Sequence, residues 1–148
     1  ELCELPYNAQ GRLLGVISDG RFTPESSFET ENVEVKLILG TSKDVEKALG
    51  DNTLRRDLLY RINRFHIHMP PLRERGSDIV VLYKHFVQKY NAMYGKEVDA
   101  KPNRGTSRFL RRYKFPGNVR ELENLVARAV FFADSNEISF EHLTETEN

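Results

Sequence analysis

The sequence has 148 residues, 39% of them hydrophobic and 30% charged, which suits one domain or two small subdomains. Its 22 basic residues balance 22 acidic ones, so overall charge argues neither for a nucleic-acid binder nor for a membrane-surface protein. The single cysteine, Cys3, excludes an internal disulfide, and no apolar run approaches the length of a membrane span, so a cytoplasmic protein is expected.

The first half of the chain predicts a mixture of helices and strands. Apolar residues at helical spacing predict a helix over 7–19. The segment 33–39 starts in alternation and ends continuously apolar, as a strand entering a buried sheet does. Two short helices are expected at about 43–49 and 53–62. A short alternating strand over 65–68 follows and is stopped by two prolines.

The second half predicts helices only. The first, over about 78–93 and capped by Ser77, has an expected inward face made of Ile79, Leu82, Phe86, Tyr90 and Met93. The second spans about 104–113. The third spans about 118–134, and its expected inward residues are Leu122, Leu125, Val126, Ala129 and Val130. Ser139 is a candidate cap for one final turn.

The start of the third helix carries an unexpected cation. A Pro-Gly turn leads to Asn118, with Glu121 in capping-box spacing and Arg120 in the first turn. Because a helix N-terminus already carries partial positive charge, an arginine there favours a nearby anion, and a guanidinium beside backbone N–H groups suits a phosphate. The alternative is an ordinary ion pair of Arg120 with Glu121, Glu123 or another carboxylate.

Charge is also distributed unevenly along the chain. Residues 101–120 hold seven Lys or Arg and no acidic residue, whereas residues 134–148 hold five acidic residues and no Lys or Arg. A local basic surface is therefore expected.

Several blocks of sequence, in one order and at compatible spacings, carry a resemblance. They are 1–6, 10–14, 33–39, 54–63, 70–75, 78–79 and 115–122. Together they resemble the C-terminal part of the AAA+ domain of sigma-54-dependent transcriptional activators, the bacterial enhancer-binding proteins. The resemblance implies an α/β fold: the C-terminal portion of a AAA+ P-loop NTPase core over 1–70, followed by an all-helical lid over 71–148.

The resemblance also implies a function. Members of this family are ATPases that use ATP and Mg²⁺, form rings that are usually hexamers, and remodel sigma-54 RNA polymerase. Contact with DNA is expected through a further domain that this sequence does not contain. The chain opens on Glu1 rather than Met, so an excised or truncated piece is expected.

Site residues follow position by position from the same resemblance. Glu1 matches the acidic residue that ends the Walker B motif and polarises the attacking water. Arg55 and Arg61 match arginine fingers that reach the neighbouring subunit's nucleotide, although pairing with Asp57 or Asp51 is the alternative. Arg120 matches the sensor 2 arginine of the lid.

The sequence departs from the family at the sensor 1 position. The family usually has Ala-Thr-Asn there, and this chain has Gly40-Thr41-Ser42. Thr41 and Ser42 are the expected nucleotide-binding residues, but the Ser42 hydroxyl has a shorter reach than an amide and fewer donors.

Three motifs of the family are absent from the sequence: the G-x-x-x-x-G-K-[ST] phosphate loop, a GAFTGA-like loop and a helix-turn-helix tail. The isolated chain is therefore not expected to hydrolyse ATP. The competing interpretations are a non-catalytic AAA+ remnant and a DNA-binding or interaction module, in which the helices around 104–134 imitate a helix-turn-helix. His66 and His68 share a strand face but lack a third ligand, so no metal site is expected.

Overall fold

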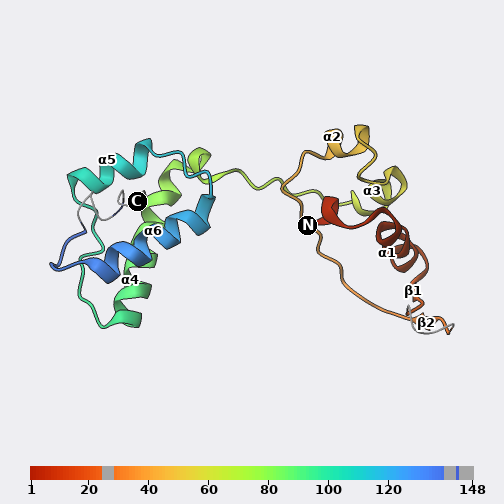
Figure 1. The fold of residues 1–148 in the computed structure, drawn as a ribbon, viewed down its shortest axis with the longest axis horizontal. Coiled ribbons are helices and arrows are strands. Elements are labelled where there is room, and N and C mark those ends of the chain that lie inside the picture. Colours follow the sequence, from red (N-terminus) through yellow and green to blue (C-terminus); the bar gives the residue numbers. More distant parts are fainter. Residues whose placement is uncertain (25–28, 139–142, 144–148) are drawn as a thin grey trace. The chain divides into compact units, whose positions relative to one another are not determined.

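The computed structural model describes residues 1–24, 29–138 and 143. The chain divides into two units, Glu1–Ile67 and His68–Asn148 (Figure 1). The sequence places the boundary a few residues later, between 70 and 71. Within the described residues, no helix is long and apolar enough to cross a membrane.

The first unit is built from short helices and one small hairpin. Its helical elements are η1 (Leu2–Glu4), α1 (Tyr7–Asp19), α2 (Val45–Gly50) and α3 (Arg56–Ile62). The strands β1 (Arg21–Phe22) and β2 (Glu31–Asn32) pair in antiparallel fashion, with Arg21 opposite Asn32. The buried core of this unit consists of Leu2, Cys3, Ala48, Leu54 and Leu58, with α1 residues packed against it.

Helix α1 begins after Pro6 and ends at Gly20, whose φ of 62° is left-handed and therefore suits glycine. The Gly20 N–H donates to the Val16 carbonyl and closes the last turn. Helix α2 begins at a side-chain cap, because the Asp44 carboxylate accepts a hydrogen bond from the Lys47 N–H. Both helices therefore follow local signals in the sequence.

The prediction of two strands in this unit is wrong, because neither strand forms in this structure. Residues 33–39 and 65–68 belong to no strand, and their apolar side chains are open to solvent, with Ile38 89% and Phe65 92% exposed. A buried strand needs hydrogen-bonded neighbours on both sides. Among the described residues the only sheet is the β1–β2 hairpin, so these segments have no neighbour with which to pair.

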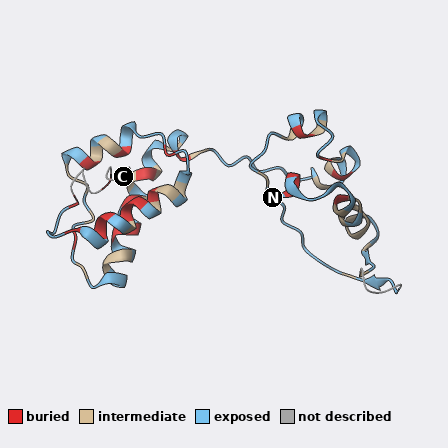
Figure 2. Ribbon diagram, in the orientation of Figure 1, coloured by how far each residue is buried: buried red, intermediate tan, exposed pale blue. Residues whose placement is uncertain are grey.

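In its described residues the second unit contains helices joined by loops and no strand, as predicted. It contains η2 (Leu72–Glu74), α4 (Gly76–Tyr94), α5 (Arg104–Arg112) and α6 (Asn118–Phe132). All five residues expected on the inward face of α6 are buried. Figure 2 shows buried positions along α4 and α6, which pack against each other. Fully buried residues such as Tyr83, Leu110 and Phe115 join the three long helices into one core.

Three local predictions for this unit fail. Met93 is 62% exposed rather than inward, and Tyr83 and Val87 occupy the buried face of α4 with Phe86 instead. Ser77 does not cap α4, because the helix starts one residue earlier, at Gly76, and has no side-chain cap. Helix α6 ends at Phe132 rather than at 134. The proposed cap at Ser139 lies outside the described residues.

Candidate functional site

Glu1 and Ser42 lie side by side although they are far apart in sequence. The Glu1 Oε2 accepts a hydrogen bond of 2.9 Å from the Ser42 N–H, and the Leu2 N–H donates to the Gly40 carbonyl at 2.8 Å. The bond from the Ser42 N–H lowers the pKa of the Glu1 carboxyl below its ordinary value of 4.5. Glu1 is therefore an exposed, ionised carboxylate with one oxygen held in place.

Thr41 completes this cluster. Its Oγ1 accepts a hydrogen bond of 3.1 Å from the Lys43 N–H, which shapes the turn after residue 40. Lys43 in turn forms an ion pair of 3.6 Å with Glu4 on η1. The three residues predicted to surround a γ-phosphate in this unit, Glu1, Thr41 and Ser42, are thus brought together by backbone and side-chain contacts.

Arg55 lies at the start of α3 with its guanidinium engaged. Its Nε and Nη2 donate to the two carboxylate oxygens of Asp57 at 3.0 and 2.7 Å, and the charge centre lies 5.0 Å from the centre of the Tyr7 ring. The Asp57 carboxylate raises the pKa of Arg55, and the Arg55 guanidinium lowers the pKa of Asp57. The pairing with Asp57 considered for Arg55 from the sequence is therefore present.

Gln10 holds the backbone at this point. Its side chain is fully buried; Nε2 donates to the carbonyls of Leu5 and Thr53, and Oε1 accepts from the Arg55 N–H at 2.9 Å. One glutamine thus joins the start of α1, the loop before α3 and the N-terminus of α3. Sequence reasoning did not single it out. The sequence did contain a signal of its burial, because Gln10 falls on the apolar stripe of α1 that continues through Leu13, Leu14 and Ile17.

Arg61 sits in the last turn of α3, close to the end of α1. Its Nη2 lies 3.4 Å from the Ser18 carbonyl, and this is its one hydrogen bond among the described residues. Arg55 contacts the start of α1 and Arg61 its end, so the two arginines leave α3 at opposite ends. The structure does not bring them to one point.

Arg120 belongs to the second unit and lies beside a hollow. The hollow, of about 890 Å³, is lined by residues of α5, of the segment that follows it and of α6, together with Leu143. The lining includes Phe109, Tyr113, Arg120, Glu121 and Arg128. In the described part of the chain no side chain pairs with Arg120. The two carboxylates considered as its partners are engaged elsewhere: Glu121 accepts from the Tyr113 hydroxyl, and Glu123 accepts from Lys89.

The turn before α6 differs from a simple capping box. Asn118 does not cap its own helix; its Oδ1 accepts from the Leu72 N–H at 2.9 Å and so ties η2 to α6. Glu121 closes the turn instead, because its Oε2 accepts from the Gly117 N–H at 2.8 Å. Both Phe115 and Asn118 have left-handed φ angles, of 46° and 53°. This tight backbone presents Arg120 on the exposed side of the first turn.

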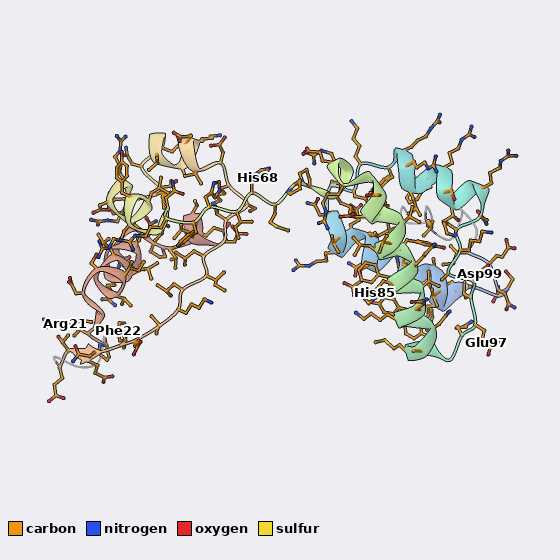
Figure 3. The ribbon with its side chains drawn as sticks, turned by 180° about the vertical axis from the view of Figure 1, so that it is seen from behind. Arg21, Phe22, His68, His85, Glu97 and Asp99 are labelled. Carbon is orange, nitrogen blue, oxygen red and sulfur yellow. The ribbon has the colours of Figure 1, made fainter. Side chains whose placement is uncertain are left out.

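Within the described residues, no group of three or more His, Cys, Asp or Glu side chains is placed to hold a metal ion. His66 and His68 lie in an exposed extended segment, not on a strand (Figure 3 labels His68).

Similarity to known proteins places these features in a family. Residues 1–68 match the Sigma-54 interaction domain, and residues 73–147 match the AAA+ ATPase lid domain. The phenol regulator MopR of Acinetobacter guillouiae is 40% identical over 134 residues, which are 90% of this chain and 24% of MopR. The regulatory protein XylR of Pseudomonas putida is 39% identical over 93% of this chain and 24% of its own length.

A solved structure with a similar fold is NtrX from Brucella abortus in complex with ADP. It superposes with a TM-score of 0.89 and 25% identity, covering 98% of this chain and 34% of NtrX. The chain thus spans about a quarter of the curated relatives and a third of the solved one. The resemblance drawn from the sequence is confirmed: the chain belongs to the AAA+ ATPases of the sigma-54-dependent activator family, with part of the AAA+ core followed by the AAA+ ATPase lid domain.

Proposed function

We propose that this chain works inside a sigma-54-dependent transcriptional activator, as part of an ATP-hydrolysing ring that remodels sigma-54 RNA polymerase. The observation that carries the proposal is the contact between Glu1 and Ser42. An ionised carboxylate, held by the backbone of the sensor position, is the group needed to polarise a water for attack on a γ-phosphate. The solved relative NtrX was crystallised with ADP and with ATP, which supports a nucleotide as the ligand.

In this proposal Thr41 and Ser42 follow the γ-phosphate through their hydroxyls. Because the Ser42 N–H donates to Glu1, only the Ser42 hydroxyl can contact phosphate or water. When the phosphate moves after hydrolysis, the segment 40–42 would move with it, and this segment also orients Glu1. In this proposal the segment couples hydrolysis to movement of the chain.

Arg55 and Arg61 are proposed to act on the nucleotide of a neighbouring subunit in a hexameric ring. Guanidinium groups stay charged and grip phosphate oxygens in a fork, which suits a charge that develops in the transition state. Arg61 has one long hydrogen bond within the described residues and can turn outward readily. Arg55 would exchange the Asp57 carboxylate for phosphate oxygens, with Gln10 keeping its backbone in place.

Arg120 is proposed as the lid residue that contacts the nucleotide of its own subunit. Support comes from its exposed position in the first turn of α6 and from the engagement of Glu121 and Glu123 with other groups. An anion near that helix start would relieve the unfavourable placement of a cation beside the helix dipole.

Magnesium fits this arrangement through the nucleotide. Mg²⁺ is usually held by one or two carboxylates together with substrate phosphates and waters, and it supplies charge neutralisation during phosphoryl transfer. In this proposal the phosphates would hold Mg²⁺, and Glu1 would polarise the attacking water rather than bind the metal. The chain's own part is to hold that carboxylate and to orient it.

The test is phosphate release by an activator in which this chain is joined to a phosphate loop. Glu1→Gln should lower kcat by roughly a thousandfold while ATP still binds, because the amide cannot polarise the attacking water. Glu4→Gln, a matched change on the next element, should leave kcat within about twofold. Equal activity of Glu1→Gln and the parent protein would contradict the assignment of Glu1.

A non-catalytic AAA+ remnant is the second candidate, and two observations favour it. Arg55 is held in a bidentate ion pair by Asp57, and Ser42 stands where the family has an amide. If the whole protein lacks a phosphate loop, the chain can dock on a partner but cannot hydrolyse ATP. ATP binding measured by calorimetry on the whole protein separates the two candidates.

A further inference from the structure

Helix α5 exposes a stripe of arginines. Arg104, Arg108, Arg111 and Arg112 are all exposed, whereas Thr106 and Leu110 on the opposite face are buried. At about 100° per residue the four arginines fall within about 100° of one another. Figure 3 shows long nitrogen-tipped side chains extending outward from α5. We name this stripe the arginine face.

In the described part of the second unit, the arginine face has no anionic partner. Among the described residues, none of its four guanidinium groups forms an ion pair or a side-chain hydrogen bond. The carboxylates closest in sequence are engaged: Asp99, labelled in Figure 3, accepts from the Lys101 N–H, and Glu121 accepts from Tyr113. Their bonding is directed toward backbone and hydroxyl groups.

This arrangement costs stability in the isolated unit. Arg104 and Arg108, and likewise Arg108 and Arg112, are like charges four residues apart, which repel by a few tenths of a kcal/mol per pair. Arg104 also sits in the first turn, where the helix dipole disfavours a cation. Arg111 and Arg112 lie in the last turn, where the dipole favours cations, so the unfavourable terms are the position of Arg104 and the two repulsive pairs. An anionic partner would relieve these terms.

We propose that the arginine face binds the phosphate backbone of duplex DNA without reading its sequence. Every charged residue on α5 is an arginine, whose fork matches phosphate oxygens. From Arg104 to Arg112 the helix advances about 12 Å, a length over which a duplex presents on the order of seven phosphates. The stripe contains no Asn or Gln that could read a base edge, so its contacts position the protein without specifying a sequence.

A second copy of the chain is the competing partner, through its acidic residues 134–148. That segment carries five acidic residues in fifteen positions, a much lower charge density than a phosphate backbone. Charge density therefore favours DNA. Flanking Lys101 and Lys114 extend the positive surface at both ends of α5.

The test is fluorescence anisotropy of a labelled 20-base-pair duplex of arbitrary sequence, titrated with the 148-residue protein over a series of salt concentrations. Arg108→Gln with Arg112→Gln should weaken binding by at least tenfold at low salt and reduce the salt slope by about two. The matched control, Lys84→Gln with Arg64→Gln, removes two exposed positive charges elsewhere and should change affinity by less than threefold. Arg108→Lys with Arg112→Lys should retain most of the binding.

Circular dichroism of each variant checks that α5 remains folded, and the control and lysine variants keep the comparison meaningful if the glutamine variant is less stable. Three results would overturn the proposal. One is equal DNA binding by the glutamine variant and the control, and another is tenfold discrimination between unrelated duplexes. The third is salt-sensitive self-association in sedimentation, lost in the glutamine variant while the parent chain shows no binding to DNA.

Discussion

A single buried glutamine determines the geometry around the candidate arginine finger. The Gln10 side chain satisfies the carbonyls of Leu5 and Thr53 and the N–H of Arg55. Because all three backbone groups lie close to a buried side chain, removing the amide leaves them without partners. Gln10 is therefore both a packing residue and the residue that positions the N-terminus of α3.

Gln10→Leu should destabilise the first unit by about 3 kcal/mol, because three polar backbone groups lose their hydrogen bonds while the volume is kept. Urea unfolding followed by circular dichroism measures the loss. Gln88→Leu, an exposed glutamine on α4, should change stability by less than about 0.5 kcal/mol. A Gln10→Leu chain as stable as the Gln88→Leu chain would contradict this account of Gln10.

The Glu1 carboxyl should titrate below its ordinary pKa of 4.5, chiefly because the Ser42 N–H bonds its charged form. Because the pKa of this carboxyl is lower in the folded state than in the unfolded state, the contact stabilises the fold fully at pH values above the pKa of the unfolded state. The contribution is lost as pH falls through the folded pKa.

Carbon-detected NMR of the Glu1 carboxyl follows the titration. Ser42→Ala keeps the N–H and should retain most of the lowered pKa, whereas Ser42→Pro removes the donor and should return it toward 4.5. Identical titrations in both variants would show that the backbone contact is not the cause.

At the scale of elements, the start of α6 depends on a residue with two tasks. Asn118 adopts a φ of 53° and its side chain accepts from the Leu72 N–H, which ties η2 to the lid helix. Asparagine tolerates left-handed backbone better than most residues. The same side chain that permits the turn therefore also bonds across it.

Asn118→Ala should cost about 2 kcal/mol, since it loses the bond to Leu72 and strains the left-handed backbone. Asn118→Gly loses the same bond but removes the strain, so it should cost about 1 kcal/mol less. Thermal unfolding of both variants gives the difference. If alanine is tolerated as well as glycine, residue 118 is not left-handed in solution.

The lid could be predicted from the sequence more fully than the core. Helical periodicity located α4, α5 and α6, and the five inward residues of α6 are all buried, because these helices bury their apolar faces against one another. The segments 33–39 and 65–68 have equally clear patterns but remain extended and exposed. A helix makes its own hydrogen bonds, whereas a strand needs neighbours that the described residues do not supply.

The site residues also divide into those that the sequence predicted and those that it did not. The resemblance pointed to Glu1, Thr41 and Ser42, and the fold brings them together. Periodicity contains no information on the Glu1–Ser42 contact, or on whether a carboxylate pairs with Arg120. Gln10 was missed because a glutamine on an apolar stripe looks like a tolerated exception. Its structural role depends on hydrogen bonds to three backbone groups that lie in separate segments of the chain.

At the scale of the whole molecule, the 148-residue chain should not hydrolyse ATP. The sequence contains no G-x-x-x-x-G-K-[ST] loop, so the backbone cradle and lysine that bind the β- and γ-phosphates are absent. Phosphate release with Mg-ATP should equal a blank without protein. Turnover above the blank that Glu1→Gln abolishes would contradict this expectation.

Arg120 should differ from the fingers in an activator that joins this chain to a phosphate loop. Arg55→Ala or Arg61→Ala should lower kcat by roughly a thousandfold with ATP affinity much less changed, because a finger acts on transition-state charge. Arg120→Ala should also weaken nucleotide-dependent assembly, measured by sedimentation with and without ATP. Arg128→Ala, on the same hollow, is the matched control and should leave assembly unchanged.

The central claim is that this chain contributes Arg55 and Arg61 to a nucleotide site on a neighbouring subunit. The direct measurement mixes two inactive forms of the intact activator, one with Arg55→Ala or Arg61→Ala and one disabled at its phosphate loop, and records ATP hydrolysis against their ratio. Mixed rings contain some interfaces where an intact finger faces an intact nucleotide site, so activity should partly return, with a maximum at intermediate ratios. If mixed rings are shown to form and no ratio restores hydrolysis, the two arginines do not act across the subunit boundary and the account is wrong.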